Sequence, residues 1–223
     1  MSDGSCASIR VLLVDDHAVV REGYRRLLER EPGIEVVGEA GNAEQACECA
    51  RALSLDVVVM DIGLPGASGI DALRHMLAER PQLRVLIFSM HDDAIFCSRA
   101  MDAGAVGFLS KSSAPEALIE AIYAVFRGER YLSPDVAENL ARQRSMSAPL
   151  VLDALTAREF EVLRLLVRGE TVGAIATRLG LSEKTVANHQ TALRDKLGVR
   201  NGVQLALRAA ELGLSGASVV PGE

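Results

Sequence analysis

Hydrophobic runs and amphipathic segments alternate five times in the first 130 residues of the chain. Short apolar runs such as Val57-Val58-Val59-Met60 have the length and β-branched content of strands that are buried on both faces of a parallel sheet. The pattern predicts strands at 9–14, 34–38, 57–60, 85–89 and 106–109, and helices at 18–30, 43–53, 68–79, 92–102 and 115–127. This alternation predicts an α/β domain at residues 8–130, with a five-stranded, parallel, doubly wound sheet in the flavodoxin-like order 2-1-3-4-5.

The pattern changes after residue 130. Residues 131–152 are polar and turn-rich, with one modest helical piece after Pro134, and they predict a linker. From 153 to 214 every predicted element is helical, and Thr156, Ser182 and Asn201 stand at helix N-cap positions. These residues predict an all-α domain of four helices, and residues 215–223 predict a frayed tail.

Composition and charge narrow the possible partners. No apolar run approaches the roughly 18 residues of a membrane span, and residues 1–8 lack a secretory signal, so we expect a cytoplasmic protein with no membrane partner. Residues 1–130 hold 20 acidic and 13 basic side chains, whereas residues 153–214 hold 7 acidic and 9 basic ones. The acidic front half suits a cation site or a protein partner, and the mildly basic back half is compatible with nucleic acid.

Several polar side chains follow the carboxyl ends of the predicted strands: Asp15, Asp16, Asp61, Ser89 and Lys111. In the predicted strand order these ends converge on one crevice. Three neighbouring carboxylates repel one another and need a compensating cation, and their hard oxygen ligands suit Mg²⁺. With the metal in place Asp61 can act as a nucleophile, while Lys111 and Ser89 supply donors for phosphoryl oxygens. This set of residues predicts that Asp61 forms an aspartyl-phosphate.

The same residues carry a family resemblance. Val14-Asp15-Asp16-His17, Met60-Asp61 with Pro65 and Gly66, Ser89, and Gly107-Phe108-Leu109-Ser110-Lys111 resemble the receiver domain of bacterial two-component response regulators over about residues 9–128. The resemblance implies that a sensor histidine kinase phosphorylates Asp61. It also implies that Asp16, Asp61 and the Gly63 carbonyl bind Mg²⁺ directly, with Asp15 acting through water. Ser89 and Phe108 would form a switch pair in which the ring turns inward after phosphorylation.

The predicted helices on either side of Gly180-Leu181 form a helix-turn-helix. Placing Val186 inward puts Leu193 and Leu197 inward as well, so the opposite face can enter a major groove. Asn188 can pair with adenine, and Ala187 or Thr191 can touch a thymine methyl group. The candidate DNA contacts are Lys184, Thr185, Ala187, Asn188, His189, Thr191, Arg194, Lys196 and Arg200.

The helical domain also resembles a known family. Leu155-Thr156-Ala157-Arg158-Glu159, Ser182-Glu183-Lys184-Thr185-Val186 and Lys196-Leu197-Gly198-Val199 are similar to LuxR/FixJ-type DNA-binding domains over about residues 155–214. With a receiver in front, the whole chain resembles a NarL/FixJ-type response regulator. The resemblance implies a phosphorylation-dependent transcription regulator that binds double-stranded DNA as a homodimer. Phosphorylation would either release a covered DNA-binding domain or build a dimer, and the sequence does not choose between these.

Other interpretations of the same residues stay open. Asp15 and Asp16 could merely cap a helix, His17 is expected to be a surface residue, and His189 is as readily structural as phosphate-binding. A second function class is a phosphohydrolase with Asp61 as nucleophile, but Gly63 stands where such enzymes carry a second acid. A third is a vestigial receiver with constitutive DNA binding. We expect no enzymatic activity beyond phosphotransfer to Asp61 and its reversal.

Overall fold

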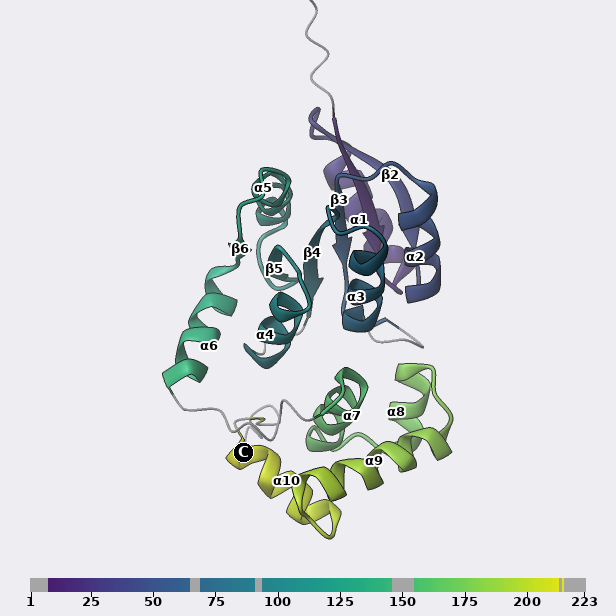
Figure 1. Cartoon of the computed structure of the whole chain (residues 1–223), viewed down its shortest axis with the longest axis vertical. Helices are drawn as coiled ribbons and strands as arrows, with labels where there is room; N and C mark the ends of the chain where they lie inside the picture. The colour runs from purple at the N-terminus through teal and green to yellow at the C-terminus, as the bar shows by residue number, and fades with distance from the viewer. Residues whose placement is uncertain (1–7, 65–68, 91–93, 146–154, 213, 215–223) are drawn as a thin grey trace, which may run out of the picture. The chain divides into compact units, whose positions relative to one another are not determined.

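The computed structural model describes residues 8–64, 69–90, 94–145, 155–212 and 214 (Figure 1). The chain divides into two compact units, 1–145 and 146–223. Some predictions lie outside the described residues: the tail at 215–223, the linker at 146–152, and the turn residues Pro65 and Gly66.

A single parallel sheet organises the first unit. Its strands are β1 (Ile9–Val14), β2 (Ile34–Ala40), β3 (Val57–Met60), β4 (Arg84–Ser89), β5 (Gly107–Ser110) and β6 (Tyr131–Leu132), in the order β2-β1-β3-β4-β5-β6. The predicted order of the first five strands is confirmed. The predicted number of strands is wrong, because β6 adds a sixth by pairing with the edge of β5.

Helices cover both faces of the sheet. They are α1 (Ala18–Leu28), α2 (Ala43–Ala52), α3 (Gly69–Glu79), α4 (Ala94–Asp102), α5 (Pro115–Phe126) and α6 (Pro134–Ser145). Alternate strand residues such as Val11, Leu13 and Leu109 form one buried core with Leu28 of α1 and Leu118 of α5. The intervening strand residues face α2, α3 and α4, since successive side chains of a strand point to opposite faces.

Residues 131–145 belong to the first unit, although the sequence predicted a linker from residue 131. Ser133 closes the junction of β6 and α6: its N–H donates to the Phe108 carbonyl at 3.1 Å, and its Oγ accepts from the Ser110 N–H at 3.3 Å. Helix α6 packs against α4 and β5, with Val136 fully buried. The segment is therefore held in place because it satisfies backbone groups along the outer edge of β5.

In the described residues of the second unit, all regular secondary structure is helical. Its helices are α7 (Ala157–Val167), α8 (Val172–Leu179), α9 (Glu183–Leu197) and α10 (Gly202–Glu211). Four N-cap side chains accept a hydrogen bond from the N–H three residues later: Thr156, Thr171, Ser182 and Asn201. Gly180 and Gly198 end α8 and α9 in the left-handed conformation that favours glycine. The prediction of four helices with a helix-turn-helix is confirmed.

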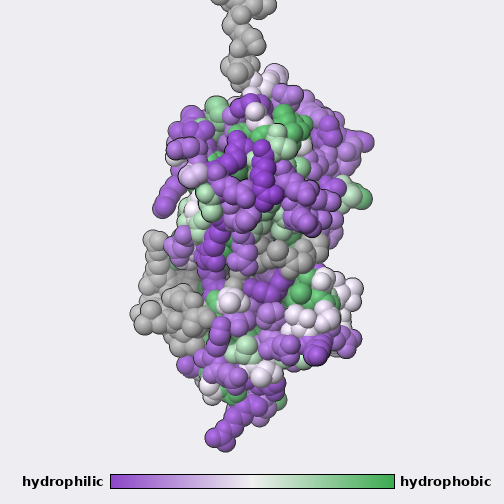
Figure 2. Space-filling view, turned by 45° about the vertical axis from the view of Figure 1, so that its right-hand side comes forward, coloured by the Kyte–Doolittle hydropathy of each residue, from purple (hydrophilic) through white to green (hydrophobic). Residues whose placement is uncertain are grey.

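The surface of the chain is mostly hydrophilic on the face that Figure 2 shows, with hydrophobic side chains in small separate patches. Four large hydrophobic side chains among the described residues are strongly exposed: Val19, Met90, Val203 and Leu207. Within the described part of the chain, every helix is too short or too polar to cross a membrane.

Candidate functional site

Asp61 follows β3 directly, at the carboxyl edge of the sheet. Its N–H donates to the Val14 carbonyl at 2.9 Å, and its Oδ1 accepts from the Gly63 N–H at 3.0 Å. The residue is only 7% exposed. The chain therefore fixes both the peptide and the carboxylate of Asp61.

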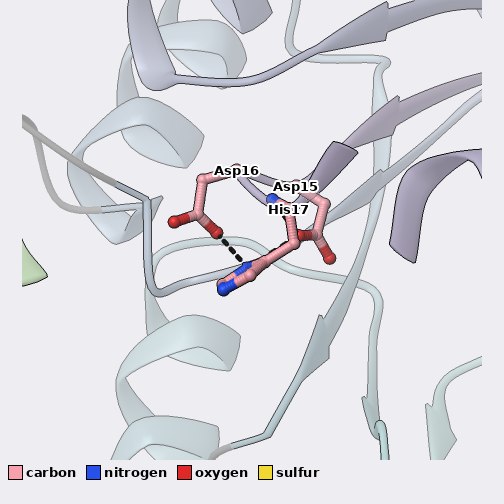
Figure 3. Close-up of side chains that lie close together, drawn as sticks. All are labelled: Asp15, Asp16 and His17. Carbon is pink, nitrogen blue, oxygen red and sulfur yellow. Dashed lines mark hydrogen bonds and ion pairs between the residues drawn. The ribbon is translucent and has the colours of Figure 1, made fainter. Parts of the chain in front are cut away.

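Asp15 and Asp16 follow β1, the strand next to β3 (Figure 3). Asp15 is 6% exposed, and its Oδ1 accepts from the His17 N–H at 2.8 Å. The His17 Nδ1 lies 2.7 Å from Asp16 Oδ1 and 3.4 Å from Asp15 Oδ1. His17 is largely exposed, as expected, but its ring also joins the two acids in a group that could hold a metal ion.

Lys111 joins the acids of β1 and β3. Its Nζ lies 2.5 Å from both Asp15 Oδ2 and Asp61 Oδ2. The Lys111 side chain is 7% exposed. Burial opposes its protonation, but the neighbouring Asp61 and Asp15 carboxylates outweigh burial and raise the pKa of Lys111 above its ordinary value. Lys111 is therefore a firmly charged ammonium group between two buried carboxylates.

Ser89 and Phe108 complete the predicted set from neighbouring strands. Ser89 ends β4 and is fully buried, and its carbonyl accepts from the Lys111 N–H at 2.9 Å. Phe108 lies on β5 and is also fully buried. Because Leu109 faces the core under α5, the Phe108 ring points to the opposite face, toward α4 and α6. The ring is thus already shielded from solvent in this structure.

The acidic pocket fits a hard divalent cation. It gathers three carboxylates and one ammonium group, so negative charge is in excess. Asp16 Oδ1 is buried and makes no hydrogen bond of acceptable geometry among the described residues, despite its closeness to His17. A buried carboxylate oxygen without a hydrogen-bond donor is costly, and a cation would relieve that cost. Carboxylate and carbonyl oxygens are the ligands that Mg²⁺ prefers.

The predicted inner face of α9 is confirmed: Val186, Leu193 and Leu197 are buried. Six candidate contacts are exposed, namely Lys184, Ala187, Asn188, Thr191, Lys196 and Arg200, and Thr185, His189 and Arg194 are half-buried. Lys184, Asn188 and Thr191 thus form a polar surface on α9 opposite its buried side chains, whereas Arg200 follows the helix.

The environment inside the second unit affects how Lys196 and His189 could contact DNA. Lys196 Nζ lies 2.6 Å from Glu159 Oε2, an oxygen that also accepts from the Thr156 N–H at 2.7 Å. Burial lowers the pKa of His189, which keeps its imidazole neutral near pH 7. Lys196 therefore ties α9 to α7, and a neutral His189 offers less attraction to a phosphate than a charged side chain.

Known proteins resemble the chain in both units. The family model of the response regulator receiver domain matches residues 11–123, and that of the bacterial regulatory proteins of the luxR family matches residues 153–209. Response regulator UvrY of Escherichia coli O6:H1 is 36% identical over 216 residues, which cover 95% of this chain and 98% of UvrY.

Solved structures of RcsB agree with this assignment. RcsB of Salmonella enterica serovar Typhimurium, bound to promoter rprA with the phosphomimetic BeF3-, has a TM-score of 0.62 and 27% identity, covering 91% of this chain and 98% of that one. A structure of two RcsB dimers bound to two parallel DNAs has a TM-score of 0.59 and 28% identity, with the same coverage. The chain belongs to the NarL/FixJ-type response regulators, which join a receiver domain to a LuxR-type DNA-binding domain.

Proposed function

We propose that phosphorylation of Asp61 by a sensor histidine kinase controls how this transcription regulator binds promoter DNA. The observation that carries the proposal is the Lys111 ammonium group held between the buried Asp15 and Asp61 carboxylates. This arrangement provides a nucleophilic carboxylate and, beside it, a fixed positive charge for phosphoryl oxygens.

The proposed transfer is a direct displacement at phosphorus. An oxygen of Asp61 bonds to the phosphorus as the bond to the kinase's histidine nitrogen breaks, and the nitrogen keeps the electron pair. Lys111, which pairs with Asp61 in this structure, would then pair with a phosphoryl oxygen. Asp16, Asp61 and the Gly63 carbonyl would hold Mg²⁺, with Asp15 acting through water. The metal would neutralise the crowded negative charge of acids and phosphoryl group.

Ser89 and Phe108 would transmit the effect of phosphorylation from Asp61 to the rest of the receiver. Ser89 ends the strand between those that precede Asp61 and Lys111, and this place supports our proposal that its hydroxyl would contact the phosphoryl group. Because Phe108 is already fully buried, we propose that the switch changes its packing against α4 and α6 rather than its exposure. The altered packing would either release a DNA-binding unit that the receiver had covered or build dimer contacts.

We propose that α9 enters the major groove. Asn188 would pair with adenine, Ala187 and Thr191 would touch thymine methyl groups, and Thr185 and His189 would lie at the edge of the contact. The proposed phosphate contacts are Lys184, Arg194, Lys196 and Arg200. Of these, Lys196 would contribute least, since its ammonium already pairs with Glu159. So few basic groups bind weakly, and two recognition helices on half-sites about 10 base pairs apart would strengthen binding.

An exposed apolar stripe on α10 supports a dimer on DNA. Val203, Ala206, Leu207 and Ala210 are exposed and have the spacing of one helical face, whereas Leu205 and Ala209 are buried in the unit. The relative RcsB has been solved as dimers bound to DNA. We propose that the stripe meets its copy in a second chain.

The experiment that tests the proposed function is a selection from a random DNA library with and without acetyl phosphate and Mg²⁺. We expect phosphodonor to increase the recovery of one operator sequence by the wild-type chain but not by Asp61→Asn. Asp102→Asn, which changes an exposed carboxylate of the same unit, should respond like the wild type. Equal recovery under all conditions would favour constitutive binding, and turnover of a generic phosphate ester would favour a phosphohydrolase.

A further inference from the structure

Arg21 of α1, which was not among the predicted site residues, contacts the backbone of the acidic pocket. Its Nη1 donates to the Asp15 carbonyl oxygen at 2.5 Å, and its Nε donates to Glu39 Oε2 at 3.1 Å. The Arg21 side chain is 18% exposed. One guanidinium group therefore links the peptide of a pocket acid to a carboxylate of β2.

An irregularity in β2 places Glu39 where Arg21 can reach it. Val11 pairs with Val36 but Leu12 pairs with Gly38, so β2 contains one extra residue at this point. Paired neighbours on adjacent strands point to the same face, and Glu39 therefore shares the α1 face with its partner Leu13. In a regular strand Glu39 would point to the opposite face. Bulges commonly redirect side chains next to functional sites.

The peptide that Arg21 holds sets the direction of the Asp15 carboxylate. The Asp15 N–H donates to the Ala40 carbonyl at 3.0 Å, which is the last backbone contact before the chain leaves the sheet. Beyond it, Arg21 donates to the Asp15 carbonyl, and the residue is only 6% exposed. Loss of Arg21 would leave this carbonyl without that donor and free the peptide to rotate. Rotation would move Asp15 and Asp16 relative to Asp61.

We propose that Arg21 is a positioning residue of the phosphorylation site, holding the Asp15 peptide so that the acid pair keeps the orientation that metal binding requires. The inference rests on the proposed function of the pocket. The change in Mg²⁺ affinity that this role predicts for loss of Arg21 is opposite in sign to the change expected from removing its charge alone. A nearby positive charge repels Mg²⁺, so removing the charge alone would tighten Mg²⁺ binding, whereas losing the peptide contact would weaken it.

Arg25 provides a matched control. It lies one turn further along α1, and its Nη1 donates to the other oxygen of Glu39 at 2.8 Å. Arg25→Gln therefore removes the same charge from the same helix and the same ion-pair network but leaves the contact between Arg21 and Asp15. Arg21→Lys keeps the charge, but its single ammonium cannot reproduce the two-sided guanidinium contact.

The experiment is a calorimetric Mg²⁺ titration of the full-length chain without phosphodonor, followed by the rate of Asp61 labelling with acetyl phosphate. We expect Arg21→Gln and Arg21→Lys to bind Mg²⁺ about 10- to 100-fold more weakly, as for other residues that orient metal ligands, and to be labelled more slowly. Arg25→Gln should match the wild type or bind slightly tighter. Thermal unfolding would establish that each variant is folded, and Arg21→Lys carries the test if Arg21→Gln does not fold.

The possible outcomes separate this inference from the proposed function. Unchanged or tighter Mg²⁺ binding by both Arg21 variants would overturn the positioning role while the wild type still accepts a phosphoryl group. Equal weakening by Arg25→Gln would overturn it as well, because the effect would then belong to the ion-pair network as a whole. Failure of the wild type to bind Mg²⁺ and to be labelled would overturn the function of the pocket itself.

Discussion

At the scale of single residues, the acidic pocket depends on side chains that are far apart in the sequence. Asp15, Asp61 and Lys111 could be predicted from their places at strand ends, and the structure brings them together around one ammonium group. The contributions of His17 and Arg21 were missed. Both lie shortly after Asp15 in a segment that looks like the exposed start of a helix, and only the register of β2 reveals a partner for Arg21.

Removing the Lys111 charge should destabilise the first unit. Lys111→Met leaves two buried carboxylates without their cation, and breaking such a buried pair typically costs about 3–5 kcal/mol of unfolding free energy. We expect Mg²⁺ to restore much of the loss. Urea unfolding followed by tyrosine fluorescence measures this, because all three tyrosines lie in the first unit. Arg74→Met, an exposed change on α3, is the control, and equal stability of both variants would contradict the prediction.

At the scale of elements, local sequence signals predicted most helices and strands but missed the strand at the edge of the sheet. N-caps such as Thr156 and Ser182 were visible because their chemistry depends on neighbours within three residues. Strand β6 was missed because two residues carry no periodic pattern. It forms because the edge of β5 supplies unpaired backbone groups to Tyr131, Leu132 and Ser133. Helix α6 consequently packs on the receiver.

The contact between α7 and α9 should depend on pH through Glu159. Burial raises the pKa of Glu159, but hydrogen bonds from Lys196 and Thr156 outweigh burial and hold it below the ordinary value. Folding therefore favours the carboxylate, and its contribution is present above about pH 4.3 and is lost as the pH falls through the lowered pKa. We expect Glu159→Gln to lower the unfolding free energy by about 1–3 kcal/mol at neutral pH.

The measurement is the difference in unfolding free energy between the wild type and Glu159→Gln, taken from the circular dichroism transition that tyrosine fluorescence does not report. The difference should begin to shrink as the pH falls through the ordinary glutamate pKa of about 4.3, and it should approach zero below the lowered pKa of the folded state. A difference that stays constant over this range would show that the charge of Glu159 contributes nothing to the contact with Lys196.

At the scale of the whole molecule, an acidic receiver and a mildly basic DNA-binding unit occur in one chain, and a dimer on DNA would bring two such chains together. Helix α10 carries more apolar residues than the unit buries. The structure identifies which of them are available, because Leu205 and Ala209 are buried whereas Val203 and Leu207 are exposed. A contact through the stripe would remove exposed apolar surface from water.

Leu207→Asp should abolish dimeric binding to the operator while leaving Asp61 labelling unchanged. Leu207 is 62% exposed, so the substitution adds a charge to the stripe without disturbing the core. Gln204→Glu adds the same charge to the same helix outside the stripe, and its carboxylate can still accept from the Arg200 N–H. Gel-shift titration would show the complex size for each variant. Dimeric complexes of equal affinity for both variants would exclude this face of α10 from the contact.

The sequence alone determined the two-part architecture, the order of the first five strands and the acids at their ends. These follow from short-range periodicity and from the rule that parallel strands place their carboxyl ends at one edge. Only the tertiary structure decided the place of residues 131–145, the direction of Glu39 and the shared ammonium of Lys111. Each depends on register or contact between segments distant in the chain, and a one-residue shift in a strand reverses the face on which a side chain lies.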